Sequence, residues 1–365
     1  MKKTITILIS IIFISSAVAN TPIKSDSISK IQLCLILDVS GSMNGLLGQA
    51  QNEIWKTVSF LEEFQKDSLE TVIELAVVSY GNNGYTENGH VNLITDFTEN
   101  IDQVAEDLWR MEIGGKNEFC GFAIKNSLNH LSWEEADIFK CLIIAGNESF
   151  DQGEVDFEAS IREAIKKGIS FNTIYCGERE KGIYENWENA AKIGKGNYAN
   201  IDQEIVIDEF KTPYDHSLMQ FYFDYKSTYF EEADKKAELN QFDTKGEVSP
   251  VFRDRIIYKF NRRKKEKDIV DEFYDSNWEM KEFEASEIPE KWQKLSIGAL
   301  KFKLLEQARK RNTYIEGFEL YAKKIKDFLE ITVQPKLKEK TLNLAMSEMM
   351  KVQLIEFGYE IRRQK

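Results

Sequence analysis

The sequence predicts an α/β fold: a doubly wound, mostly parallel sheet followed by an α-helical C-terminal region with coiled-coil character. Short apolar runs, bounded by Gly and Asn, alternate with segments of helical periodicity over about the first 200 residues. Such alternation is typical of parallel strands with helices packed on both faces. Two long amphipathic patterns after residue 297 have no strand between them, which predicts the helical C-terminal region.

The first strand and the first helix are the clearest predicted elements. The run from Leu33 to Leu37 is wholly apolar and ends in Asp38, as in a strand buried on both faces. Apolar residues then recur at spacings of three and four, which predicts a helix with one apolar face: Leu47, Ala50, Ile54, Val58 and Leu61.

The remaining elements follow in the same alternating order. We expect strands over 72–80, 90–97, 138–145, 170–176 and 196–201, with 90–97 at an edge of the sheet. We expect helices over 101–111, 119–131, 157–167 and 187–193. Ligands of open parallel sheets bind beyond the carboxyl ends of the strands, and Asp38 lies at such an end.

The segment after the first strand carries three oxygen donors at alternate positions. Asp38, Ser40 and Ser42 supply a carboxylate and two hydroxyls within one turn of backbone, which suits Mg²⁺ or a similar hard cation. Gly41 lets this turn tighten. The alternative is an ordinary strand-to-helix turn in which a serine caps the helix. We favour the metal loop because a carboxylate at the end of a buried strand needs a compensating charge.

This segment resembles the start of von Willebrand factor A domains, in which an Asp-x-Ser-x-Ser motif forms the metal-ion-dependent adhesion site. Strand, motif and amphipathic helix arrive in the same order here, and the resemblance covers roughly residues 30–210. It implies a von Willebrand factor A or Rossmann-like fold. It also implies a divalent cation, with Mg²⁺ expected first and Mn²⁺ or Ca²⁺ as alternatives.

Two positions depart from the family's pattern. Glu118 stands where a threonine is expected, and it either ligates the cation or serves as an acidic residue at a helix start. Gly146 stands where an aspartate is expected, so Asn147 or Glu148 would have to supply that oxygen. The metal-ligand set implied by the resemblance is Asp38, Ser40, Ser42, Glu118 and Glu148. The alternative is a degenerate site on a domain kept as a protein-binding scaffold.

Beyond the sheet domain, we expect a linker or helical connection over 211–250 and a helical region over 251–365. The apolar periodicity predicts a long helix over about 297–333 and another after Pro335, packed together as an antiparallel hairpin or coiled coil. Residues 1–250 carry a net charge of −19 and residues 251–365 one of +6. Two units of opposite charge could attract each other or face different partners.

The N-terminus is typical of a secretory signal peptide over residues 1–19. Lys2 and Lys3 precede an apolar run over 5–18, and Ala17-Val18-Ala19 forms a cleavage site. A membrane anchor is the alternative, but the run is short for a bilayer, and no later segment approaches spanning length. The sequence therefore predicts export to a periplasm or to the cell exterior.

Four cysteines in an exported chain raise the question of disulfides. Cys34 and Cys141 lie inside predicted strands and are expected to be buried as small apolar side chains. Cys120 and Cys176 lie where loops should leave one edge of the sheet, so a Cys120–Cys176 disulfide is the preferred pairing. Four free thiols are the alternative.

These features favour an exported binding module that mediates protein–protein interaction or adhesion. The expected partner is another protein; the acidic chain, with a net charge of −13, argues against nucleic acid. The oligomeric state is left open. The alternative is a metal-free structural or scaffold protein of the cell envelope that acts through its C-terminal helices.

An enzyme is not expected. His90 begins the expected edge strand, His130 ends an expected helix and His216 follows Pro213. Each is expected to be a surface or capping residue rather than a base or a ligand. Ser40 and Ser42 have no nearby base in the sequence and are better explained as ligands than as nucleophiles.

Overall fold

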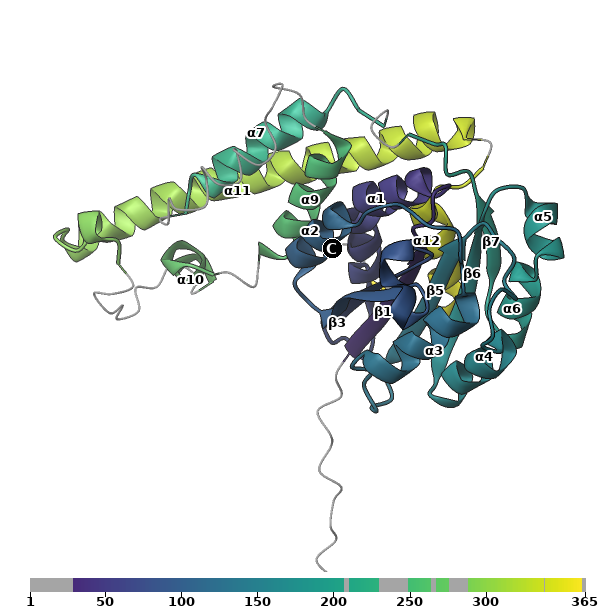
Figure 1. Ribbon diagram of the computed structural model, residues 1–365. Helices are drawn as coiled ribbons and strands as arrows, with labels where there is room; N and C mark the ends of the chain where they lie inside the picture. Colours follow the sequence, from purple (N-terminus) through teal and green to yellow (C-terminus); the bar gives the residue numbers. More distant parts are fainter. Residues whose placement is uncertain are drawn as a thin grey trace, which may run out of the picture.

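The computed structural model describes residues 29–206, 210–229, 249–263, 267–275, 288–337 and 339–362 (Figure 1). The predicted signal peptide lies outside these ranges. The described chain consists of a sheet with helices on both faces, here called the sheet domain, and a group of helices beside it (Figure 1). No helix in these ranges combines the length and the apolar character that a membrane crossing requires.

Six strands form the main sheet in the order β4-β3-β1-β5-β6-β7. Their bounds are β1 (Ser29–Asp38), β3 (Thr71–Tyr80), β4 (Val91–Thr98), β5 (Phe139–Gly146), β6 (Ile169–Cys176) and β7 (Tyr198–Ile201). All neighbouring pairs are parallel except β3 and β4, so β4 is an antiparallel edge strand. The predicted doubly wound, mostly parallel sheet is therefore confirmed, with the edge strand where it was expected.

Helices cover both faces of this sheet because its strands are apolar on both sides. In β1, Leu33 and Leu35 pack into one core and Cys34 and Ile36 into the other. The first core is closed by α1 (Asn44–Glu62), α2 (Ile101–Arg110) and α12 (Leu342–Glu356), the second by α3 (Cys120–His130), α4 (Phe157–Lys166) and α6 (Trp187–Ile193).

The apolar face predicted for α1 is buried from Leu47 to Leu61, which confirms the helix and its orientation. Side-chain caps fix other helix starts; Asn100, for example, accepts a hydrogen bond from the backbone of Gln103. Three short features were not predicted: α5 (Arg179–Tyr184), the 3₁₀ segment η1 (Asn83–Asn88) and the pair β2 (Phe64–Gln65) with β8 (Glu360–Ile361). They are too short to show a period in the sequence.

The predicted Cys120–Cys176 disulfide is wrong, because all four cysteines are free and buried. Cys120 belongs to the core under α3 and Cys176 to the core under α1, so the sheet lies between the two side chains. Burial raises the pKa of both thiols above the ordinary range. Cys34 and Cys141 are buried within their strands, as expected.

Reducing agent is therefore expected to leave the melting temperature unchanged. A disulfide contributes about 2–4 kcal/mol to stability, so its reduction would lower the melting temperature by several degrees. Thiol titration of the unfolded protein should find all four cysteines reactive without prior reduction. A smaller thiol count, or a drop in melting temperature with reductant, would contradict the four free thiols.

The helices outside the sheet domain form what we call the helical arm. It comprises α7 (Asp215–Lys226), α9 (Pro250–Asn261), α10 (Ile269–Asp275) and α11 (Ile297–Phe328), with short segments η4 (Glu290–Trp292), η5 (Leu329–Val333) and η6 (Gln334–Lys336). The long helix α11 lies along α7 (Figure 1), and aromatic side chains fill their contact. Gly317 makes this approach possible, because a Cβ there would lie 2.2 Å from the ring of Phe221.

The predicted hairpin between the two C-terminal helices is wrong. The long helix α11 forms as predicted, but it packs on α7 and α10, whereas α12 packs on α1 and on the sheet (Figure 1). In the chain, the helical arm lies between β7 and α12. The helix α12, which lies beyond the predicted domain boundary at 210, thus belongs to the helical layer that contains α1.

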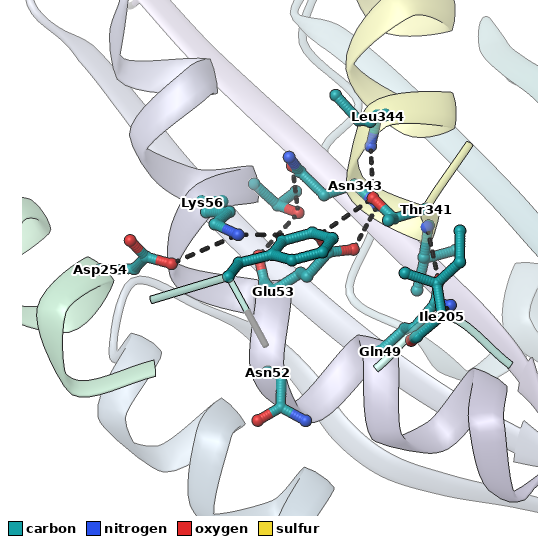
Figure 2. A network of polar contacts seen from close by, with 12 residues as sticks. Gln49, Asn52, Glu53, Lys56, Ile205, Asp254, Thr341, Asn343 and Leu344 are labelled. Carbon is teal, nitrogen blue, oxygen red and sulfur yellow. Dashed lines mark hydrogen bonds and ion pairs between the residues drawn. The ribbon is translucent and has the colours of Figure 1, made fainter. Parts of the chain in front are cut away.

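A buried polar network fastens α12 to α1 (Figure 2). The Glu53 carboxylate accepts hydrogen bonds from the Thr341 hydroxyl and from the Asn343 backbone N–H, both at 3.0 Å. Gln49 Oε1 accepts a third from the Leu342 N–H at 2.8 Å. Side chains of α1 therefore satisfy the backbone donors at the start of α12, which would otherwise be left unpaired.

The chain leaving the sheet domain and the chain returning to it run side by side. The Asp202 N–H donates to the Lys340 carbonyl at 3.3 Å, and Gln49 Nε2 donates to the Asp202 carbonyl at 2.7 Å. Gln203 Nε2 donates to the Ser42 carbonyl at 3.2 Å. The chain directly after β7 is thus hydrogen-bonded to the loop that follows β1.

Candidate metal site

Asp38 ends β1 as a fully buried carboxylate with one oxygen left open. Its Oδ1 accepts a hydrogen bond from the Ser40 N–H at 2.8 Å. Its Oδ2 is buried and has no hydrogen-bond partner among the described residues. Burial raises the pKa of Asp38 to about 7, and the negative charges of Glu118 and Glu148 add to this effect. An ionised carboxylate buried in this way is costly unless a positive charge, such as a bound cation, lies beside it.

The two serines of the motif lie side by side in the following loop. Ser40 Oγ and Ser42 Oγ are 3.5 Å apart, and the Ser42 hydroxyl also contacts the Asn147 side chain, whose Nδ2 donates to it at 3.1 Å. Ser40 is buried while Ser42 faces solvent. The three oxygen-bearing side chains predicted from the motif are therefore brought together at one edge of the sheet.

The loop between α2 and α3 (residues 111–119), here called the second loop, is joined to the loop after β1 by backbone hydrogen bonds. The Gly114 N–H donates to the Val39 carbonyl at 2.8 Å, and the Gly41 N–H donates to the Gly115 carbonyl at 3.2 Å. Gly115 has φ of +121°, and a Cβ there would lie 1.9 Å from the Gly81 carbonyl oxygen, so only glycine fits. This pairing carries the second loop to the edge where Asp38 lies.

Glu118, at the end of the second loop, joins the site. Its side chain is buried, and it lies close enough to the Ser40 side chain for that hydroxyl to stabilise the ionised carboxylate. Burial raises the pKa of Glu118, and the charge of Glu148 adds to that effect. Glu118 also lies just before α3, so its position fits both roles that the sequence left open, a cation ligand and an acidic residue at a helix start.

The loop after β5 contributes differently from what the resemblance implies. Gly146 ends β5 without a side chain, and Asn147 contacts Ser42 through its amide. Glu148 acts on Asp38 and Glu118 through its charge, while its backbone carbonyl accepts a hydrogen bond from Trp187 Nε1 at 2.7 Å. The structure thus gathers Asp38, Ser40, Ser42 and Glu118, and it brings Glu148 near them as a charge.

These side chains fit a hard divalent cation only if hydroxyl oxygens take part. Within the described ranges, no three Asp, Glu, His or Cys side chains come close enough together to hold a metal by themselves. The site instead offers the open, buried Asp38 Oδ2, two serine hydroxyls and the Glu118 carboxylate. An all-oxygen set of this kind suits Mg²⁺, Mn²⁺ or Ca²⁺.

Sequence reasoning missed Tyr80. It pairs with Asp38 in the register of β3 against β1, and its hydroxyl donates to the Ala145 carbonyl at 3.3 Å. Its place at the end of a strand was visible in the sequence. Its position beside Asp38 depends on the strand order, which the sequence does not give.

Solved structures with a similar fold include three bacterial proteins. The pilus adhesin SpaC from Lactobacillus rhamnosus GG is 11% identical over 48% of this chain and 28% of SpaC, with a TM-score of 0.37. BatB from Bacteroides thetaiotaomicron is 16% identical over 47% of this chain and 90% of BatB, with a TM-score of 0.37. A von Willebrand factor type A structure from Catenulispora acidiphila is 15% identical over 47% of this chain and 39% of that protein, with a TM-score of 0.35. This chain thus spans under a third of SpaC.

No protein-family model matches the sequence, and no curated protein matches it. The sheet order and the helices on both faces confirm the doubly wound, mostly parallel α/β fold that the sequence predicts.

Proposed function

We propose that this chain is a binding protein whose sheet domain contacts another protein through a divalent cation held by Asp38, Ser40, Ser42 and Glu118. The observation that carries the proposal is the buried, unpartnered Oδ2 of Asp38 at an edge where these oxygen donors converge. A bound cation would compensate the Asp38 charge and offer a coordination position to an oxygen of the partner. Mg²⁺ is the first expected ion.

The charge of the site indicates what kind of partner oxygen it accepts. Asp38 and Glu118, when both are ionised, already balance a divalent cation, and Glu148 adds negative charge nearby. A carboxylate of the partner would therefore meet little net attraction. We expect the partner to ligate through a neutral oxygen, such as a carbonyl or a hydroxyl.

We propose that the protein works outside the cytoplasm, in a periplasm or at the cell exterior. The support is the sequence of residues 1–19, with its basic start, apolar run and Ala-Val-Ala cleavage site. The four free cysteines do not conflict with this location, because each thiol is buried.

We propose no catalytic role. The thiols are buried, with raised pKa values, and so are poor nucleophiles. His90 is held between the second loop and its neighbour, with the Asn117 amide 3.2 Å from Nε2 and the Asn82 carbonyl 3.4 Å from Nδ1. These contacts engage its ring in packing between the loops.

A thermal-shift titration with divalent cations tests the proposal. A ligand at a hundred times its dissociation constant stabilises a protein by about 2.7 kcal/mol, so saturating Mg²⁺ should raise the melting temperature by several degrees. Glu118→Ala should weaken this response, whereas Glu154→Gln, an exposed acid in a neighbouring loop, should leave it unchanged. An unchanged response in Glu118→Ala would remove Glu118 from the ligand set.

Capture of partner proteins by the immobilised full chain then separates two candidate functions. Capture that EDTA abolishes supports the cation-dependent module. The second candidate is a scaffold acting through the helical arm, favoured by the exposure of Ile297 (74%) and Phe302 (67%) on α11. Capture that resists EDTA and is lost in Phe302→Glu would support that scaffold.

A further inference from the structure

The Tyr80 side chain extends from β3 past the end of β1 to β5. The strand order places β1 between β3 and β5, yet the Tyr80 hydroxyl of β3 reaches the Ala145 carbonyl of β5 at 3.3 Å. The Cys120 thiol donates to the same hydroxyl at 3.7 Å. The phenol is fully buried, so its position is fixed by packing and by these two contacts.

The Tyr80 hydroxyl takes up the space that a side chain at position 146 would need. A Cβ on Gly146 would lie 2.2 Å from the Tyr80 oxygen, 3.0 Å from Asp38 Oδ2 and 3.1 Å from Asp38 Cβ. The first distance is far inside van der Waals contact, and neither group can move freely in a packed interior. Position 146 is therefore closed to every residue except glycine.

The Asp38 carboxylate is confined on its other side as well. A Cβ on Gly81 would lie 2.8 Å from Asp38 Oδ1. Asp38 thus lies between two glycines, Gly81 directly after β3 and Gly146 at the end of β5, and the Tyr80 hydroxyl borders the Gly146 side. In this position, Oδ2 has no hydrogen-bond partner among the described residues.

We infer that Tyr80 is the residue that determines which carboxylates this site contains: its hydroxyl excludes any side chain at position 146, so the cation is held by groups from the loop after β1 and from the second loop. The inference rests on the proposed cation binding. β5 then ends without a carboxylate because Tyr80, a side chain of β3, occupies the space that such a side chain would need. The carboxylate of Glu118 then takes over the charge that position 146 cannot supply.

A double-mutant cycle between positions 80 and 146 tests the exclusion without any metal. Gly146→Ala should lower the melting temperature of the cation-free protein by several degrees, because the added methyl collides with the Tyr80 hydroxyl. In the Tyr80→Phe background that oxygen is gone, so the same Gly146→Ala change should cost less than half as much. Gly114→Ala is the matched control, since a Cβ there meets nothing within 4 Å.

The second arm measures Mg²⁺ binding by calorimetry. Gly146→Asp in the Tyr80→Phe background places a carboxylate beside Asp38 and should bind Mg²⁺ about tenfold more tightly than Tyr80→Phe alone. Gly146→Asp in the presence of Tyr80 should bind more weakly than wild type, because the site is distorted. A merely structural role of Tyr80 would not produce this reversal.

The results separate the inference from the proposed function. Equal losses of melting temperature for Gly146→Ala in both backgrounds, or no gain of Mg²⁺ affinity in the double variant, would overturn the inference. Absence of Mg²⁺ binding by the wild-type protein would overturn the proposed function, and the metal-free cycle would still decide whether Tyr80 closes position 146.

Discussion

Asp38→Asn is expected to abolish divalent-cation binding and to make the cation-free protein more stable at pH 8, by about 1–3 kcal/mol. The variant keeps the shape of the side chain and removes a buried charge whose Oδ2 has no partner. The same substitution should thus remove cation binding and increase stability. Replacing a residue needed only for packing would not increase stability. Urea denaturation with and without Mg²⁺ measures both.

The same carboxylate predicts how the stability of the cation-free protein depends on pH. Asp38 has a pKa of about 7 when folded and an ordinary value near 4 when unfolded, so between these values the folded state binds more protons. The free energy of unfolding should therefore fall as pH rises from 4 to 7, by at most about 4 kcal/mol from this group. Excess Mg²⁺ should restore it above pH 7, because the cation binds the ionised form.

The pH dependence has a direct control. In Asp38→Asn this part of the decline should disappear, whereas Glu154→Gln, an exposed acid of the same domain, should keep it. A pH profile identical in wild type and Asp38→Asn would show that Asp38 titrates normally and that its burial is compensated in another way.

Glu53→Ala is expected to destabilise the protein by about 3–4 kcal/mol. The substitution leaves the Thr341 hydroxyl and the Asn343 N–H without their acceptor at the start of α12 (Figure 2). It also removes a negative charge 3.8 Å from Lys56, which keeps its 3.5 Å contact with Asp254. Denaturant unfolding measures the loss, and limited proteolysis between α11 and α12 should become faster as the start of α12 opens.

Glu63→Ala is the matched control at the end of the same helix. Glu63 forms an exposed ion pair with Lys326 at 3.3 Å, and such pairs contribute at most about 1 kcal/mol. A loss below about 1 kcal/mol in Glu53→Ala would mean that α12 is held by its apolar contacts alone.

The sheet domain could be predicted from the sequence because its signals are local. Apolar runs such as 33–37 define strands by themselves, and the spacing from Leu47 to Leu61 defines the face of α1. The Asp38-x-Ser40-x-Ser42 spacing places three donors in one loop whatever the rest of the chain does. Glu118 needed only the further step of aligning the second loop with a known pattern.

The features that were missed depend on contacts between distant segments. The Cys120–Cys176 pairing looked sound because both residues lie near one edge of the sheet, but they lie on opposite faces of it. The amphipathic pattern of α12 specifies an apolar face and not its partner, which is α1 rather than α11. Tyr80 became visible only through the strand order that sets it beside Asp38.

The central claim is that this edge of the sheet holds a divalent cation through Asp38. An electron paramagnetic resonance titration with Mn²⁺ tests it most directly, because the free ion and the bound ion give distinct signals. We expect one bound Mn²⁺ per full chain at pH 8, displaced by excess Mg²⁺ and absent in Asp38→Asn. A wild-type chain that binds no Mn²⁺, or an Asp38→Asn variant that binds it equally well, would contradict the claim.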